Sequence, residues 1–156
     1  MDDVFEIIVQ QDMSAESDLE LIGGIADRLL RDGYVEPTFK DAIINREKQY
    51  PTGLVTDVYG VAVPHIDTVH VKRNAVFVAT LREPVTFHEM GGEKDDTVAV
   101  ECLFMLLLSG DGEILKLLAG FMKVLQNRED LTLIRAADSP DAIREVVRKY
   151  LDKIGV

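Results

Sequence analysis

Apolar residues fall into two patterns along this chain: short β-branched runs and longer stretches with the spacing of amphipathic helices. The short runs predict strands at residues 4–9, 59–63, 75–81 and 98–108. The last run is apolar at nearly every position, which predicts a central strand covered on both faces. Turns are expected where proline and glycine gather, at Pro51 to Gly53 and at Gly91 and Gly92.

Helical spacing accounts for most of the other apolar positions. Ser17 followed by Glu20 has the form of a capping box, and the helix that it opens is expected to end at Gly33. A second helix is expected from Pro37 to about Gln49. Later helical segments are expected at 114–125, at 131–136 and after Ser139-Pro140. The inward face of the first helix is expected to carry Leu19, Ile22, Ala26, Leu29 and Leu30.

This order of elements predicts one α/β domain over residues 1–156, with helices on both faces of a sheet. A chain of 156 residues, 47% of them hydrophobic, can bury a sizeable core without disulfides or metals. The single cysteine, Cys102, lies inside the apolar run 98–108, so disulfides are excluded and a reducing compartment is expected. That run is interrupted by Glu101 and is too short to span a bilayer. With no signal-peptide pattern, the expected location is cytoplasmic, without direct membrane insertion.

The charge of the chain argues against two classes of partner. Its 28 acidic and 17 basic residues give a net charge of −11, which disfavours nucleic acid and anionic lipid. The charge is uneven, because residues 60–82 carry +2 and the remainder carries −13. A locally basic segment suits a bound anionic group, although ordinary charge scatter explains the same count equally well.

The most informative position is His65. The predicted strand 59–63 stops at Pro64, which has no N–H to continue a ladder, so His65 is presented where the strand becomes a loop. Histidine can act as a nucleophile or a base because its ordinary pKa lies near neutrality. For Pro-His alone, a surface histidine that closes a strand is the competing interpretation.

A second segment changes this balance. The chain reads Arg46-Glu47, then Thr52-Gly53, and then the strand end Ala62-Val63-Pro64-His65. This ordered pair of segments resembles the enzyme IIA domains of the bacterial sugar phosphotransferase system, in the mannitol/fructose superfamily. Within it, the chain most resembles the galactitol-specific subgroup, because His70 follows His65 at the spacing Pro-His-x-x-x-x-His. The resemblance covers nearly the whole chain. It implies a three-layer sandwich around a central mixed β-sheet.

The resemblance also implies a reaction, phosphoryl relay. A histidine of enzyme IIA takes a phosphoryl group from HPr and passes it to a cysteine of enzyme IIB, which serves the membrane subunit enzyme IIC during uptake of galactitol or a related polyol. His65 is then the phosphoacceptor, and Arg46 is the cation that holds the phosphoryl group. Alternatively, Arg46 complements the dipole at a helix end. The relay needs no cofactor and no metal, and the sequence signals neither.

Two further residues of these segments have open roles. Glu47 either orients Arg46 or an imidazole, or is an ordinary surface glutamate. Thr52 either presents its hydroxyl or its amide to the site, or is a turn residue before Gly53.

The chain departs from the mannitol-type pattern at one point. There a second histidine follows the core strand, whereas here the stretch from Ser109 has none and its nearest counterpart is Glu113. His70, five residues after His65, matches the galactitol-type subgroup and could replace the missing partner, or it is an ordinary loop histidine. His88 is not expected to have a role.

Two other functions remain open. A regulatory phospho-switch of the nitrogen type would use the same histidine but act by binding a kinase, a channel or a transcription factor. A binding domain in which His65 is purely structural is disfavoured, because Arg46 and Thr52-Gly53 accompany the histidine.

Overall fold

The computed structural model describes residues 5–109 and 114–155. Within this part of the chain, the strands are β1 (Glu6–Met13), β2 (Gly53–Val55), β3 (Gly60–Ala62), β4 (Ala75–His88) and β5 (Thr97–Leu107). The helices are α1 (Asp18–Arg31), α2 (Phe39–Gln49), α3 (Ile114–Leu125), α4 (Arg128–Ala136) and α5 (Pro140–Ile154), with a 3-10 turn η1 (Thr68–His70).

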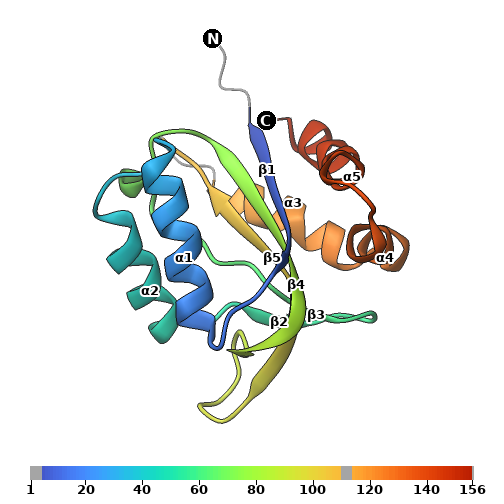
Figure 1. Ribbon diagram of the computed structural model, residues 1–156, viewed down its shortest axis with the longest axis horizontal. Coiled ribbons are helices and arrows are strands. Elements are labelled where there is room, and N and C mark those ends of the chain that lie inside the picture. Colours follow the sequence, from blue (N-terminus) through green and yellow to red (C-terminus); the bar gives the residue numbers. More distant parts are fainter. Residues whose placement is uncertain (1–4, 110–113, 156) are drawn as a thin grey trace.

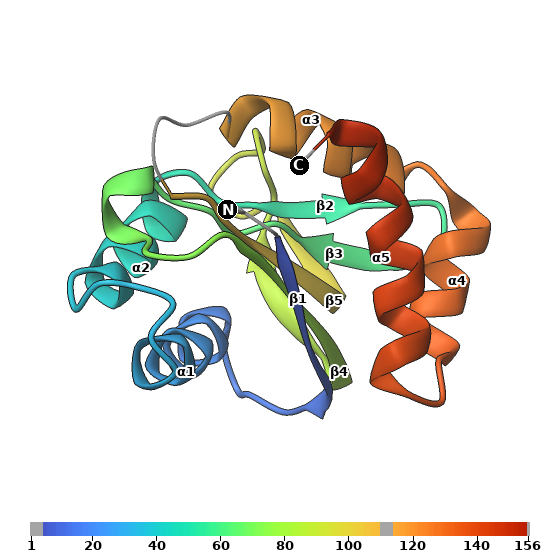
Figure 2. The ribbon, with the colours of Figure 1, turned by 90° about the horizontal axis from the view of Figure 1, so that it is seen from above.

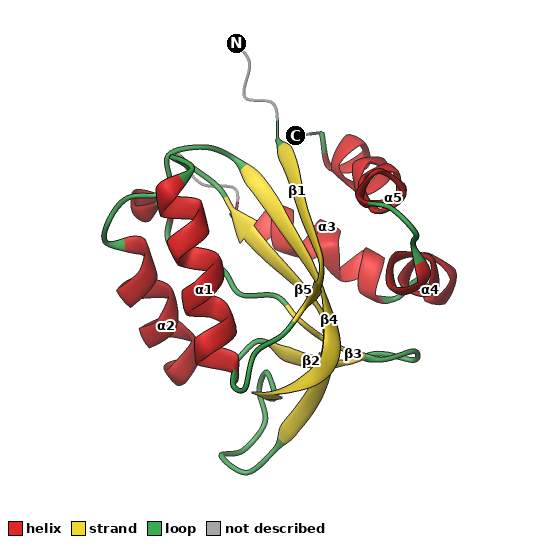
Figure 3. Ribbon diagram, in the orientation of Figure 1, coloured by secondary structure: helices red, strands yellow, loops and turns green. Residues whose placement is uncertain are grey.

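The strands form a mixed sheet in the order β1-β4-β5-β3-β2. β1 pairs parallel with β4 and β3 pairs parallel with β5, whereas β4/β5 and β2/β3 are antiparallel. Figures 1 and 3 show α1 and α2 on one side of this sheet and α3, α4 and α5 on the other. The fold is therefore the α/β three-layer sandwich around a central mixed sheet, with helices on both faces, that the sequence and the resemblance predicted.

Alternate residues of the central strands supply the two halves of the core. Val76 and Val78 pack with α3, α4 and α5, whereas Phe77 and Ala79 pack with α1 and α2. All four side chains are fully buried, as is most of β5, which confirms the central strand predicted from the run 98–108. Figure 2, seen from above, shows both helical layers against the sheet.

The predicted start of the first helix is confirmed. The Ser17 hydroxyl accepts a hydrogen bond from the Glu20 N–H at 3.1 Å. The helix ends at Arg31, and Gly33 follows with a φ of +84° that suits glycine. The inward face was partly wrong, because Leu30 is 42% exposed while Ile25 is buried.

Three strands differ from the prediction by more than one residue at an end. β1, predicted at residues 4–9, runs from Glu6 to Met13. β2 replaces part of the loop expected near Pro51, because Gly53 to Val55 pair with β3. β4 was predicted to end at Leu81 but continues through Pro84 to His88. Its pairing with β5 shifts between Thr80 and Val85, and such a bulge accommodates a proline that cannot donate to the ladder.

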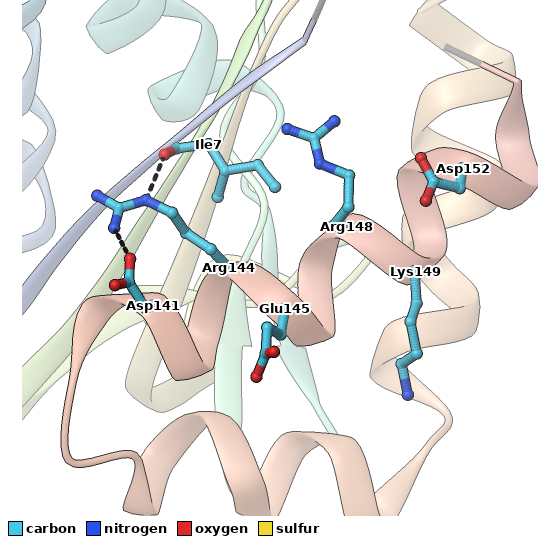
Figure 4. A pocket seen from close by; sticks show the side chains of 7 residues that line it. All are labelled: Ile7, Asp141, Arg144, Glu145, Arg148, Lys149 and Asp152. Carbon is cyan, nitrogen blue, oxygen red and sulfur yellow. Dashed lines mark hydrogen bonds and ion pairs between the residues drawn. The ribbon is translucent and has the colours of Figure 1, made fainter.

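The edge of the sheet at β1 is covered by arginine side chains of α5. The Nε of Arg144 donates to the Ile7 carbonyl at 3.1 Å, and Arg148 donates to the Phe5 carbonyl at 2.9 Å. Figure 4 shows Arg144, Arg148 and Ile7 along the groove between this strand and the helix. Two carbonyls at the start of this edge, which a foreign strand could use, are thus already occupied.

Among the described residues, no helix combines the length and apolar character needed to cross a membrane.

Candidate functional site

The main chain around His65 is held from two sides. On one side, Leu106 of β5 donates its N–H to the Pro64 carbonyl at 3.1 Å. On the other side, the Val63 N–H donates to the Thr52 carbonyl at 3.3 Å. Val63 and Pro64 are buried, so the backbone leading to His65 is fixed by the sheet and by the loop that follows α2.

The imidazole of His65 is partly buried, and its Nδ1 lies 2.9 Å from the Val63 carbonyl oxygen. A carbonyl oxygen only accepts, so Nδ1 carries the proton in this bond and the neutral ring keeps a lone pair on Nε2. Burial lowers the pKa of His65, and the positive charge of Arg46 lowers it further. The lowered pKa favours the neutral ring, whose lone pair lies on Nε2.

Arg46 lies in the last turn of α2 and is partly buried. Its guanidinium carbon lies 5.2 Å from the centroid of the Tyr50 ring, a cation–π contact across one helical turn. Its Nε is buried and has no hydrogen-bond partner in the described part of the chain. Because its charge also lowers the pKa of His65, Arg46 combines an electrostatic effect on the imidazole with a donor that no described residue uses.

Glu47 is only 3% exposed, so the surface alternative for this residue is wrong. Its carboxylate accepts from the Thr52 N–H at 2.8 Å and from the Thr52 hydroxyl at 3.0 Å. Burial raises the pKa of Glu47 to about 7, against the opposing effect of these two hydrogen bonds. The recorded hydrogen bonds of Glu47 go to Thr52 rather than to Arg46 or an imidazole.

Thr52 and Gly53 have separate structural roles. Thr52 is 2% exposed, and its Oγ1 accepts from the Val63 N–H at 3.3 Å. Gly53 runs so close to the end of β4 that a Cβ there would lie 2.6 Å from the His88 carbonyl oxygen. A larger residue would displace β2 from β4, which explains why glycine follows threonine.

His70 contacts the start of α2, whereas Arg46 lies in its last turn. The Nδ1 of His70 is 2.8 Å from the hydroxyl of Thr38, the residue that precedes α2. Thr38 is eight residues before Arg46, which is about 12 Å along the helix axis. In the described chain, no hydrogen bond joins His70 to His65.

Two other expectations concern residues near these elements. His88 is exposed at the end of β4, where its carbonyl faces Gly53. Glu113, the counterpart of the missing second histidine, lies outside the described residues. Among the described residues, no group of three or more His, Cys, Asp or Glu side chains could hold a metal ion.

The structure adds two residues that the sequence analysis did not single out. Tyr50 contacts the Arg46 guanidinium, and its spacing of four residues in a helical segment could have indicated this pairing. Val63 fixes the His65 ring through its main-chain carbonyl. No side-chain pattern reveals a contact of that kind.

Comparisons with known proteins identify the family of this chain. The family model described as "Phosphoenolpyruvate-dependent sugar phosphotransferase system, EIIA 2" matches residues 5–150. The galactitol-specific EIIA component of the sugar phosphotransferase system of Escherichia coli K12 is 28% identical over 146 residues, which cover 93% of this chain and 95% of that protein. The transcriptional regulator ManR of Bacillus subtilis is 32% identical over 109 residues, which cover 70% of this chain and 15% of that protein.

A solved structure has the same fold. The complex of enzyme IIAMtl with phosphorylated enzyme IIBMtl from Escherichia coli contains a chain that matches with a TM-score of 0.73 and 23% identity. The match covers 90% of this chain and 94% of that one.

Proposed function

This chain belongs to the EIIA 2 family of the phosphoenolpyruvate-dependent sugar phosphotransferase system, and we propose that its His65 carries the phosphoryl group. In this proposal the donor is phospho-HPr and the acceptor is a cysteine of an enzyme IIB, which serves a membrane enzyme IIC. The protein then acts as a phosphotransferase in the cytoplasm, where these partners meet.

The observation that carries the proposal is the orientation of the His65 ring. With Nδ1–H bonded to the Val63 carbonyl, the Nε2 lone pair is available to form the new bond to phosphorus. As that bond forms, the bond from phosphorus to the donor nitrogen breaks, and its electron pair stays on the donor. The phosphorylated ring keeps its Nδ1–H, and the Val63 carbonyl stabilises the positive charge that the ring then bears.

Arg46 supplies the positive charge that phosphoryl transfer requires. Its Nε is buried without a hydrogen-bond partner among residues 5–109 and 114–155, and its charge acts on His65. A guanidinium matches phosphate oxygens in geometry, and each charge-assisted hydrogen bond contributes roughly 1.5–3 kcal/mol. We assign Arg46 to the oxygens of the phosphoryl group on Nε2.

Galactitol or a related polyol is the proposed cargo of the whole system. The support is the similarity to a galactitol-specific EIIA component over nearly the full length of both chains. Recognition of the sugar itself belongs to the membrane subunit in this proposal, so no sugar pocket is assigned to the chain.

The test is reconstitution of the relay. The protein is incubated with enzyme I, HPr and phosphoenolpyruvate, and the phosphorylated product is then mixed with the isolated IIB of a galactitol system or of a mannitol system. The proposal expects phosphoryl transfer to both IIB proteins, because each accepts the group on a cysteine. Transfer to the galactitol IIB should be the faster of the two. Phosphorylation that never passes to either IIB would contradict a transport role.

A regulatory phospho-switch is the second candidate, favoured by the similarity to part of the transcriptional regulator ManR. This candidate predicts phosphorylation of His65 with no onward transfer to a IIB. The same experiment therefore separates the two functions.

A further inference from the structure

We propose that Glu47 and Thr52 are positioning residues for His65, and that they act through the main chain of Val63 to keep Nε2 of the ring unprotonated. The inference deepens the proposed function and rests on it for the effect on phosphoryl transfer. The arrangement of the ring can be measured separately, without any phosphoryl donor.

The first step is the fixing of Thr52 by Glu47. A carboxylate that is only 3% exposed is costly unless donors surround it, and both recorded donors belong to Thr52. The charged neighbours that act on Glu47 are Asp18 from α1 and His88 from β4, with opposite effects. Glu47 lies in the last turns of α2, so the bonds tie Thr52 to the end of that helix.

The second step links Thr52 to the strand that leads to His65. The Thr52 hydroxyl donates to Glu47 and accepts from the Val63 N–H at 3.3 Å. Its donor and one of its acceptor positions are therefore both used. The Thr52 carbonyl also accepts from the Val63 N–H, so this N–H is held by two oxygens of one residue.

The third step passes from Val63 to the imidazole. The Val63 carbonyl accepts from Nδ1–H of His65 at 2.9 Å. Pro64 lies between them with a fixed φ, and its own carbonyl is held by Leu106 of β5. The bond from Leu106 fixes the main chain after Val63. The orientation of the Val63 carbonyl therefore depends on the hydrogen bonds that the Val63 N–H makes to Thr52.

The consequence concerns which ring nitrogen holds the proton. The hydrogen bond made by one imidazole nitrogen sets the tautomer of the neutral ring. If the Val63 carbonyl turns away, the proton is free to move to Nε2, and the lone pair that attacks phosphorus is lost. A residue that only stabilises the fold would not alter this balance.

The experiment measures the His65 tautomer by ¹⁵N NMR of protein labelled at histidine. The His65 signals are assigned by comparison with His70→Gln and His88→Gln. Three variants are compared with the wild type: Thr52→Val, which removes the hydroxyl at constant volume; Thr52→Ser, which keeps it; and Glu47→Gln. Thr86→Val, at an exposed position of β4, is the matched control.

We expect Thr52→Val to shift His65 toward the Nε2–H tautomer and to slow phosphoryl acceptance by about threefold or more. Thr52→Ser should keep the wild-type tautomer and rate. Glu47→Gln should give values between those of the wild type and of Thr52→Val, and Thr86→Val should change neither quantity. The ¹⁵N chemical shifts of the ring decide the inference even when no protein accepts a phosphoryl group. Failure of the wild type to accept one would count against the proposed function alone.

Unchanged His65 shifts in folded Thr52→Val and Glu47→Gln would overturn the inference. If Thr52→Val does not fold, Glu47→Gln decides the question. This variant is expected to fold, because its amide oxygen can still accept from the Thr52 N–H.

Discussion

The Nδ1 of His65 lies 2.9 Å from the carbonyl oxygen of Val63, two residues earlier in the chain. This contact places the proton of the neutral ring on Nδ1 and leaves the lone pair on Nε2, the nitrogen that we propose as the phosphoryl acceptor. The positive charge of Arg46, in the last turn of α2, lowers the pKa of this ring and so favours its neutral form. A neutral imidazole under the influence of a positive charge is the arrangement that our proposal of a phosphoryl acceptor requires.

Replacing Arg46 should impair transfer more than stability. Arg46→Ala removes a phosphoryl ligand and little buried apolar surface, so phosphoryl acceptance should slow by about tenfold or more while thermal melting changes slightly. Arg46→Lys should retain part of the rate, since lysine keeps the positive charge but lacks the two parallel N–H donors of a guanidinium. Arg31→Ala, at an exposed arginine in the last turn of α1, is the control for loss of a helical arginine. Wild-type transfer by Arg46→Ala would show that another group holds the phosphoryl oxygens.

The titration of His65 should respond to Arg46. Burial and the Arg46 charge hold the pKa of His65 below its ordinary value, so phosphoryl acceptance should persist as pH falls below the range where a free histidine gains its proton. In Arg46→Ala the pKa of His65 should rise part of the way toward that value, because burial, the larger cause, remains. An NMR titration of the His65 ring measures its pKa in the wild type and in Arg46→Ala. An identical titration in the two proteins would place Arg46 beyond electrostatic reach of the imidazole.

Glu47 should make stability depend on pH. Burial raises the pKa of Glu47 to about 7 from an ordinary value of 4.5, so the native protein holds this proton more tightly than the unfolded chain. Unfolding free energy should therefore fall as pH rises between these two values, by at most roughly 1.4 kcal/mol per pH unit. Denaturant unfolding of wild type and Glu47→Gln across this range isolates the contribution. Parallel curves for the two proteins would mean that the carboxyl ionises normally.

The cover over β1 should limit association between chains. Arg144→Ala and Arg148→Ala free the carbonyls of Ile7 and Phe5, and each should lower the unfolding free energy by about 0.5–1.5 kcal/mol. The double variant should also self-associate through the exposed strand edge, as seen by sedimentation velocity. Glu145→Ala, at an exposed residue of the same groove, is the control. A double variant as monodisperse as this control would show that the edge needs no cover.

The sequence predicted the position of His65 because proline ends a strand in a recognisable way, and it placed Arg46 in the last turn of α2 because the helix end is marked by Pro51 and Gly53. It also predicted both helical layers from apolar spacing. It did not predict the burial of Glu47, since a glutamate near a helix end reads as exposed and only tertiary packing brings Thr52 onto its carboxylate. The continuation of β4 past Pro84 depends on pairing with β5, which local propensity does not encode.

The most direct test of the central claim is to locate the phosphoryl group. After incubation with enzyme I, HPr and phosphoenolpyruvate, the protein should carry one acid-labile phosphoryl group, and ³¹P and ¹⁵N NMR should place it on Nε2 of His65. His65→Ala should take up none, while His88→Gln should be labelled like the wild type. Labelling that persists in His65→Ala, or that resides on His70 or His88, would contradict the account.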